Sequence, residues 1–144
     1  MTVVSRASFG HVALTVTDLD ASIEWYSRIF DVHYVMEEAH QGGIGKLLAD
    51  DQFGLVFVLH HHDGNEGETF AETTTGLDHV GLNVGSRADL EAWQSHLEAN
   101  GVARADNADK PLTQSPITDR PYGSVLVFRD PDNIQLELFA PARP

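Results

Sequence analysis

The stretch that decides the fold is residues 9–30, which read FGHVALTVTDLDASIEWYSRIF. Most of it is written a second time 68 positions later, as LDHVGLNVGSRADLEAWQSHLE, so that His11 falls on His79 without a gap. A repeat of this kind indicates two copies of one structural unit. Each copy begins with alternating apolar residues, which is typical of a strand, and continues with apolar residues at helical spacing. The sequence therefore predicts two strand–helix units, each with one histidine in its strand.

Composition limits the classes of function. A chain of 144 residues with 42% hydrophobic content forms one domain, or two small modules that share a core. It contains no cysteine, which excludes thiolate ligands and fits a reducing, cytoplasmic location. A net charge of −13 disfavours nucleic acid and an anionic membrane surface as partners. We therefore expect a cytoplasmic protein that takes a small-molecule substrate or ligand.

Both repeats continue into further strands. In the first half, strands are expected at residues 33–39, 44–49 and 53–60. In the second half, a short strand at 102–104 and an irregular stretch at 105–123 precede a hairpin of residues 124–128 and 134–139.

The predicted fold class is α+β, with two βαβββ modules in a single domain spanning residues 9–144. Residues 1–8 are expected to be a disordered lead. Module one spans residues 9–60 and module two spans residues 77–140. Between them, residues 61–76 are polar, acidic and rich in turn formers, which predicts an exposed linker.

Three ligating side chains are expected on corresponding faces of three strands. Alternation places Gln135, Glu137 and Phe139 on one face of the last strand, opposite an apolar face. The same reasoning places His11 and His79 on the polar faces of their strands. Two imidazoles and a carboxylate could bind a divalent Fe, Mn, Co, Ni or Zn ion and leave coordination positions open for a substrate.

The motifs FGHVALTV, LDHVGLNV and DPDNIQLELF resemble those of the vicinal oxygen chelate superfamily, which includes glyoxalases, bleomycin-resistance proteins and extradiol dioxygenases. The resemblance covers about residues 9–140. It implies that each module forms a half-barrel enclosing a cavity, and that His11, His79 and Glu137 bind the metal. It also implies a homodimer, in which the half-barrels of short chains pair across subunits.

The sequence departs from this family at one ligand position. Aligning the fourth strand of each module puts Val58 opposite Glu137, and valine cannot bind a metal. This argues against glyoxalase and epimerase activity and leaves Val58 as a substrate contact. His60 lies on the same face two residues further on, where it could be a catalytic base, a replacement ligand or a substrate contact.

Further substrate contacts are expected near the last hairpin. Tyr122 lies in the loop before this hairpin, where members of the family often contact substrate. Gln135 and Phe139 flank Glu137 on the cavity face and could line the pocket or orient a ligand. By contrast, His61 and His62 are expected to begin the solvated linker.

The first hypothesis for function is a metal-dependent enzyme whose cation binds adjacent oxygens of a small substrate, with isomerase, lyase, transferase or dioxygenase chemistry. The alternative is a metal-free protein of the bleomycin-resistance type that binds an antibiotic or another small ligand. The negative charge favours a cationic ligand in that case. A third hypothesis is a regulatory domain that has kept the ligands by descent.

Overall fold

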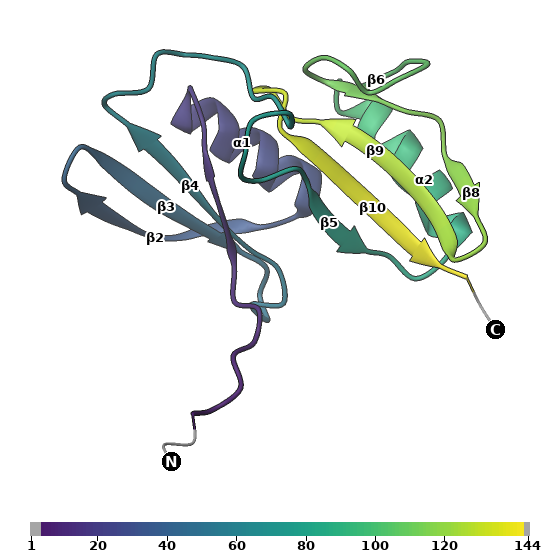
Figure 1. Cartoon of the computed structure of the whole chain (residues 1–144), viewed down its shortest axis with the longest axis horizontal. Coiled ribbons are helices and arrows are strands. Elements are labelled where there is room, and N and C mark those ends of the chain that lie inside the picture. The colour runs from purple at the N-terminus through teal and green to yellow at the C-terminus, as the bar shows by residue number, and fades with distance from the viewer. Residues whose placement is uncertain (1–3, 143–144) are drawn as a thin grey trace. The chain divides into compact units, whose positions relative to one another are not determined.

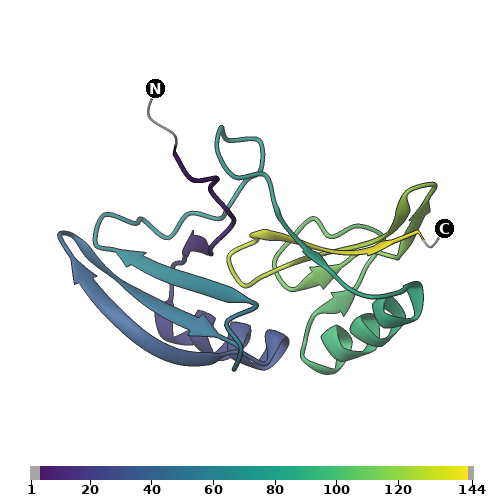
Figure 2. The same cartoon turned by 90° about the horizontal axis from the view of Figure 1, so that it is seen from below.

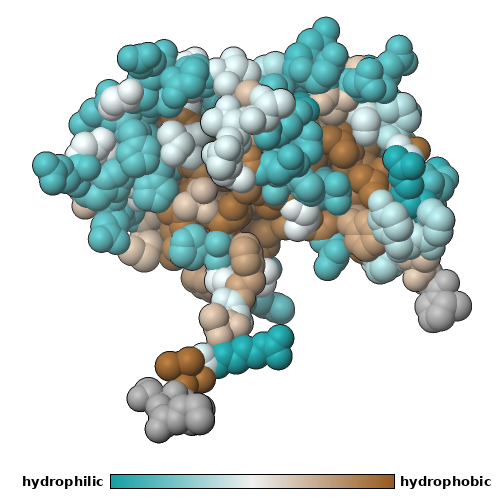
Figure 3. Space-filling model, viewed as in Figure 1, coloured by the Kyte–Doolittle hydropathy of each residue, from teal (hydrophilic) through white to brown (hydrophobic). Residues whose placement is uncertain are grey.

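The computed structural model describes residues 4–142 and divides into two compact units, Met1–Gly64 (unit 1) and Asn65–Pro144 (unit 2) (Figure 1). Each unit combines one helix with a sheet, so the predicted α+β class is confirmed. Residues 4–8 of the predicted lead are exposed and have no regular secondary structure, and residues 1–3 lie outside the described part. Polar residues cover much of the face drawn in Figure 3, as the net charge of −13 leads one to expect. Across residues 4–142, no helix has the length and apolar character needed to cross a membrane.

Unit 1 has the predicted element order. Its elements are β1 (Val12–Thr15), α1 (Leu19–Phe30), β2 (His33–His40), β3 (Gly43–Ala49) and β4 (Val56–His62). The sheet order is β1-β4-β3-β2, with β1 parallel to β4 and the other pairs antiparallel. Helix α1 begins after Asp18, whose carboxylate accepts a hydrogen bond from the Ala21 N–H at 3.1 Å.

Strand β4 differs from its prediction at both ends. It starts at Val56 and not at residue 53, because the turn continues as far as Leu55, whose N–H donates to the Asp50 carboxylate at 2.9 Å. It also runs through His61 and His62, which the sequence analysis assigned to the linker. These two residues pair with β3, so their backbone groups gain ladder partners that a solvated linker would lack.

Unit 2 repeats the plan with a more divided sheet. Its elements are β5 (Val80–Asn83), α2 (Arg87–Ala99), β6 (Ala103–Arg104), β7 (Thr113–Gln114), β8 (Thr118–Arg120), β9 (Gly123–Arg129) and β10 (Gln135–Pro141). The stretch 105–123 was expected to be irregular, yet β7 and β8 lie within it. Both are very short and pair with β9, whose edge would otherwise be unpaired.

In each unit the helix covers one face of the sheet, as Figure 2 shows. In unit 1, the rings of Tyr26 and Phe30 each lie 5.0 Å from the ring of Phe57, which is fully buried. In unit 2, Leu90 of α2 and Leu136 of β10 are buried in the same way. The opposite face of each sheet is not covered by the helix and carries half-buried residues such as Val58 in unit 1 and Glu137 in unit 2.

Strand register confirms the alignment of the two modules. In unit 1, Ala13 of β1 pairs with Val58 of β4, and in unit 2, Gly81 of β5 pairs with Glu137 of β10. Since Ala13 and Gly81 are equivalent in the sequence repeat, Val58 and Glu137 are structurally equivalent. The valine thus stands where the other module has its carboxylate.

Candidate functional site

His79 and Glu137 approach each other in unit 2. The His79 Nε2 atom lies 3.6 Å from the Glu137 Oε2 atom, and their side chains are 37% and 24% exposed. Glu137 projects from the face of β10 that α2 does not cover, because burial alternates strictly along this strand. Opposite it, Gly81 has no side chain, and a Cβ atom there would lie 3.9 Å from Glu137 Oε1. Two of the three predicted metal ligands are therefore neighbours in one unit.

Asp78 determines which nitrogen of His79 is available. The Asp78 Oδ1 atom lies 2.7 Å from His79 Nδ1, so Nδ1 carries the proton and donates it in this hydrogen bond. The lone pair of Nε2 then faces Glu137 Oε2 at 3.6 Å, so a cation placed between the two atoms would have a ligand on either side. A carboxylate that orients a histidine for a metal is a recurrent arrangement in metalloproteins. These three residues therefore fit a divalent cation.

The sequence analysis missed Asp78. Its only signal is its place directly before His79, and the other copy of the repeat has Gly10 at that position. Because the two copies differ at this position, comparing them does not identify Asp78 as a candidate site residue.

The predicted substrate contacts in unit 2 lie close to Glu137. Gln135 and Phe139 are half-buried on the same face of β10 as Glu137. The ring of Tyr122 is 6.1 Å from the ring of Phe139. Gly123 allows this approach, because a Cβ atom there would lie 2.7 Å from the Phe139 ring. The structure thus brings Tyr122 and Phe139 together, and their role in binding stays a prediction.

Unit 1 contains a hollow of about 410 Å³ on the sheet face away from α1. Its lining residues include His11, Val58 and His60, the three residues of this unit that the sequence analysis assigned to the site. His11 directly precedes β1 and is exposed. The hollow is otherwise lined by Met36, Glu37, Glu38, His40, Gly45 and Leu47.

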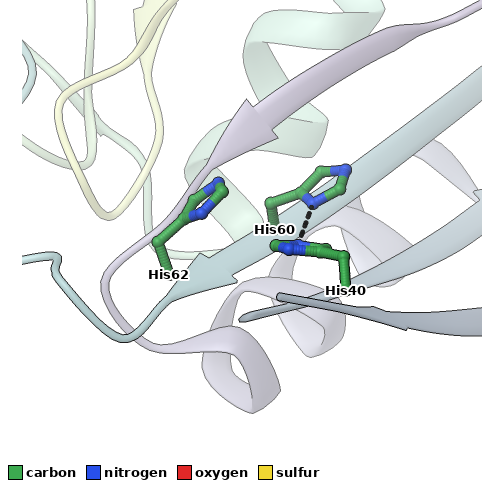
Figure 4. A group of neighbouring side chains, drawn as sticks. All are labelled: His40, His60 and His62. Atoms are coloured by element: carbon green, nitrogen blue, oxygen red, sulfur yellow. Dashed lines mark hydrogen bonds between the residues drawn. The ribbon is translucent and has the colours of Figure 1, made fainter. Parts of the chain in front are cut away.

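His60 belongs to a cluster of three imidazoles that we call the histidine trio (His40, His60 and His62). His40 Nε2 lies 3.3 Å from His60 Nδ1, and the three ring centroids are 5.2 to 5.8 Å apart. Figure 4 shows the rings gathered beside one another, with the contact between His40 and His60 dashed. The sequence analysis did not single out His40 and placed His62 in the linker, so this cluster was missed.

Two glycines of β3 make room for the histidine trio. Strand pairing puts Gly43 between His40 and His62, and Gly45 lies beside His60. A Cβ atom at Gly43 would lie 2.7 Å from the His40 ring, and one at Gly45 would lie 2.5 Å from the His60 ring. The sequence signal for the cluster is the segment GGIG (residues 42–45) paired with HHH (residues 60–62). This signal can be recognised only when the pairing register of the two strands is known.

The environment of His60 favours its neutral form. Burial lowers the pKa of His60, and the neighbouring His40, His62 and His11 lower it further, because a second positive charge nearby is unfavourable. His60 is therefore neutral at neutral pH and has a lone pair for a proton or a metal ion.

The chain belongs to the Glyoxalase/Bleomycin resistance protein/Dioxygenase superfamily, whose family model matches residues 8–138. A glyoxylase/bleomycin resistance protein/dioxygenase domain from Frankia sp. EAN1pec is 34% identical, with a TM-score of 0.81 over 96% of this chain and 100% of that chain.

Two more distant relatives carry specific names. The trivalent organoarsenical cleaving enzyme of Bacillus sp. (strain MD1) is 31% identical over 94 residues, which are 65% of this chain and 52% of that enzyme. The chain thus spans about half the length of this curated relative. A mutant of the fosfomycin resistance protein FosX from Listeria monocytogenes, complexed with Mn(II) and 1S,2S-dihydroxypropylphosphonic acid, is 20% identical. It has a TM-score of 0.65 over 96% of this chain and 93% of that chain, which shows a shared fold.

Proposed function

We propose that this protein is a metal-dependent enzyme whose divalent cation binds adjacent oxygens of a small substrate. The observation that carries the proposal is the Asp78–His79–Glu137 arrangement, in which an oriented imidazole nitrogen and a carboxylate oxygen lie 3.6 Å apart. His11 is assigned as the third ligand by the sequence repeat and by the family resemblance. It would come from the same chain or from a second copy of it.

Each polar or aromatic residue near the ligands has a proposed role. A bound divalent cation would supply Lewis-acid stabilisation of negative charge on substrate oxygens. His60 would accept a proton from the substrate, because its lowered pKa keeps it neutral. The Gln135 amide would orient the substrate by hydrogen bonding, and Phe139, Tyr122 and Val58 would contact its apolar parts.

The FosX complex supports the choice of the first probes. Its Mn(II) and dihydroxypropylphosphonic acid make manganese and a vicinal diol reasonable starting points, beside Fe, Co, Ni and Zn. Lyase, isomerase, transferase and dioxygenase chemistry all use such a centre. We do not carry over organoarsenical cleavage, because trivalent arsenic is a soft centre that favours thiolates and this sequence contains no cysteine.

A second candidate function is metal-free binding of a cationic small molecule, as in proteins of the bleomycin-resistance type. The hollow in unit 1 favours it, because Glu37 and Glu38 line it together with the apolar side chains of Met36, Leu47 and Val58. The net charge of −13 would also attract a cation.

Metal analysis distinguishes the two functions. Protein purified without a chelator or histidine tag is compared with His79→Ala and Glu137→Gln, and with Glu66→Gln, an exposed carboxylate of unit 2, as the control. We expect both ligand variants to lose about one metal ion per chain relative to the wild type and the control. Equal metal content in all four proteins, after reconstitution with each cation, would overturn the proposal, and absence of metal from all four would favour metal-free binding.

We also propose that the chain is a cytoplasmic homodimer. Strand β2 lies at the edge of its sheet, and its residues Tyr34, Val35 and Met36 are 49%, 45% and 50% exposed. An exposed apolar edge strand is a common pairing surface. Light scattering at micromolar concentration should give the mass of two chains, and the mass of one chain would contradict the dimer.

A further inference from the structure

We propose that the histidine trio is a second transition-metal site, built within unit 1 from residues other than His79 and Glu137. None of its residues is among the three assigned ligands His11, His79 and Glu137, although His60 was also considered as a replacement ligand. His40 comes from β2, and His60 and His62 come from β4. The site is thus contained in one compact unit and needs no residue of unit 2.

The spacing of the nitrogens fits a small cation. Two nitrogens bound at about 2.0–2.1 Å in tetrahedral geometry lie about 3.4 Å apart. The distance between His40 Nε2 and His60 Nδ1 is 3.3 Å. One ligand atom from each of the three residues lies within 4.8 Å of the others, so all three nitrogens are close enough to be candidates for one ion. Three imidazoles select Zn, Cu, Ni or Co over Mg or Ca, which prefer oxygen ligands.

Strand register preorganises the site. Strand β3 lies between β2 and β4, so side chains on β3 would normally separate His40 from His62. Gly43 and Gly45 stand at the two positions where those side chains would be. Glycine inside a strand is unfavourable for the strand itself and marks a close approach of other groups. Here the groups that approach are the His60 ring at Gly45, and the His40 ring together with the His61 backbone carbonyl at Gly43.

The electrostatic environment supports metal binding. Burial lowers the pKa of His60, and the neighbouring His40, His62 and His11 lower it further, which favours the neutral form of this ring that binds a metal ion. A neutral imidazole has one lone pair, so His60 cannot bind a cation at the trio and act as a catalytic base at the same time.

The test uses the full-length double variant His79→Ala/Glu137→Gln, which removes the proposed first centre. The metal-free protein is titrated with Zn(II) by calorimetry, and with Cu(II) by electron paramagnetic resonance to detect nitrogen ligands. Into this background we introduce His40→Ala or His62→Ala. The control is His33→Ala, because His33 is an exposed histidine on the same strand as His40.

We expect the double variant to bind one Zn(II) per chain and to show nitrogen couplings with Cu(II). His40→Ala and His62→Ala should weaken Zn(II) binding at least about tenfold, while His33→Ala should not change it. Circular dichroism shows whether each variant is folded. Absence of Zn(II) binding in the folded double variant, or binding that neither His40→Ala nor His62→Ala weakens, would overturn the proposal. Since the background already lacks His79 and Glu137, these outcomes do not depend on the first centre.

Discussion

Asp78 acts on the proposed metal centre through a single hydrogen bond to His79 Nδ1 at 2.7 Å. Asp78→Asn keeps the shape of the side chain but removes its charge and offers an NH₂ group to the ring. We expect metal affinity at the His79–Glu137 centre to fall by about 10- to 100-fold, because the orientation and basicity of His79 are lost. Competition titration with a chromophoric chelator measures this change. Asp109→Asn, an exposed carboxylate of the same unit, should leave the affinity unchanged, and an equal loss in both variants would contradict the role of Asp78.

Gly45 controls the position of the His60 ring. In Gly45→Ala the new methyl group would lie 2.5 Å from that ring, so the ring must leave its present position beside His40. Because the clashing atom is at the far end of a side chain, we expect the fold to survive, with a stability change within about 1 kcal/mol. Zn(II) binding by the histidine trio should be lost.

The matched control for Gly45→Ala is Gly10→Ala, since no atom lies within 4 Å of a Cβ at Gly10. Calorimetric Zn(II) titration of both variants in the His79→Ala/Glu137→Gln background, together with urea unfolding, tests this expectation. Unchanged Zn(II) affinity in Gly45→Ala would show that the ring position is not needed for binding.

At the scale of elements, the packing of α1 on the sheet depends on Phe57. This side chain is fully buried and contacts Tyr26 and Phe30 of the helix at ring distances of 5.0 Å. Phe57→Ala removes the ring and leaves a cavity, so we expect a loss of about 3–5 kcal/mol in the free energy of unfolding. Urea denaturation measures it. Phe9→Ala, at a residue that is 86% exposed, should change stability by less than about 0.5 kcal/mol, and a similar loss in both would argue against this packing.

The elements themselves were largely predictable, because alternation and helical spacing are local properties of the chain. The faces of β10 are those that the alternation predicted, with Gln135, Glu137 and Phe139 opposite a buried row. The predictions that were wrong concern segments whose structure depends on pairing with another strand. Strand β4 gains His61 and His62 because β3 is long enough to pair with them, and β7 and β8 exist because β9 offers an edge.

At the scale of the whole molecule, part of the predicted linker is bound to unit 2. Glu72 accepts two hydrogen bonds from the buried Arg129 guanidinium, at 3.0 and 2.9 Å. The Phe70 N–H also donates to the Asp132 carbonyl at 2.9 Å. Most residues of this segment are exposed, but Phe70 and Glu72 are half-buried and hold it against the turn between β9 and β10.

The ion pair between Glu72 and Arg129 makes unit 2 sensitive to acid. The Arg129 hydrogen bonds lower the pKa of Glu72 from 4.5 to about 2. A lowered folded-state pKa means that the stabilisation is complete above pH 4.5 and is lost as the pH falls from 4.5 towards 2. We expect Glu72→Gln to lose about 1–2 kcal/mol at pH 7 and to show a shallower decline of stability over this pH range. Thermal unfolding between pH 7 and pH 2.5, with Glu66→Gln as the control, tests it; parallel curves for Glu72→Gln and the wild type would contradict it.

The sequence by itself determined the repeat, the α+β class, the family, and the strand faces that carry the predicted ligands. Each of these follows from periodicity or from a motif, which are properties of neighbouring residues. Only the tertiary structure decided that Asp78 orients His79 towards Glu137, that three histidines from β2 and β4 meet above two glycines, and that Glu72 binds Arg129. These contacts join residues on different strands and loops. They depend on register and close approach, which no local pattern in the chain specifies.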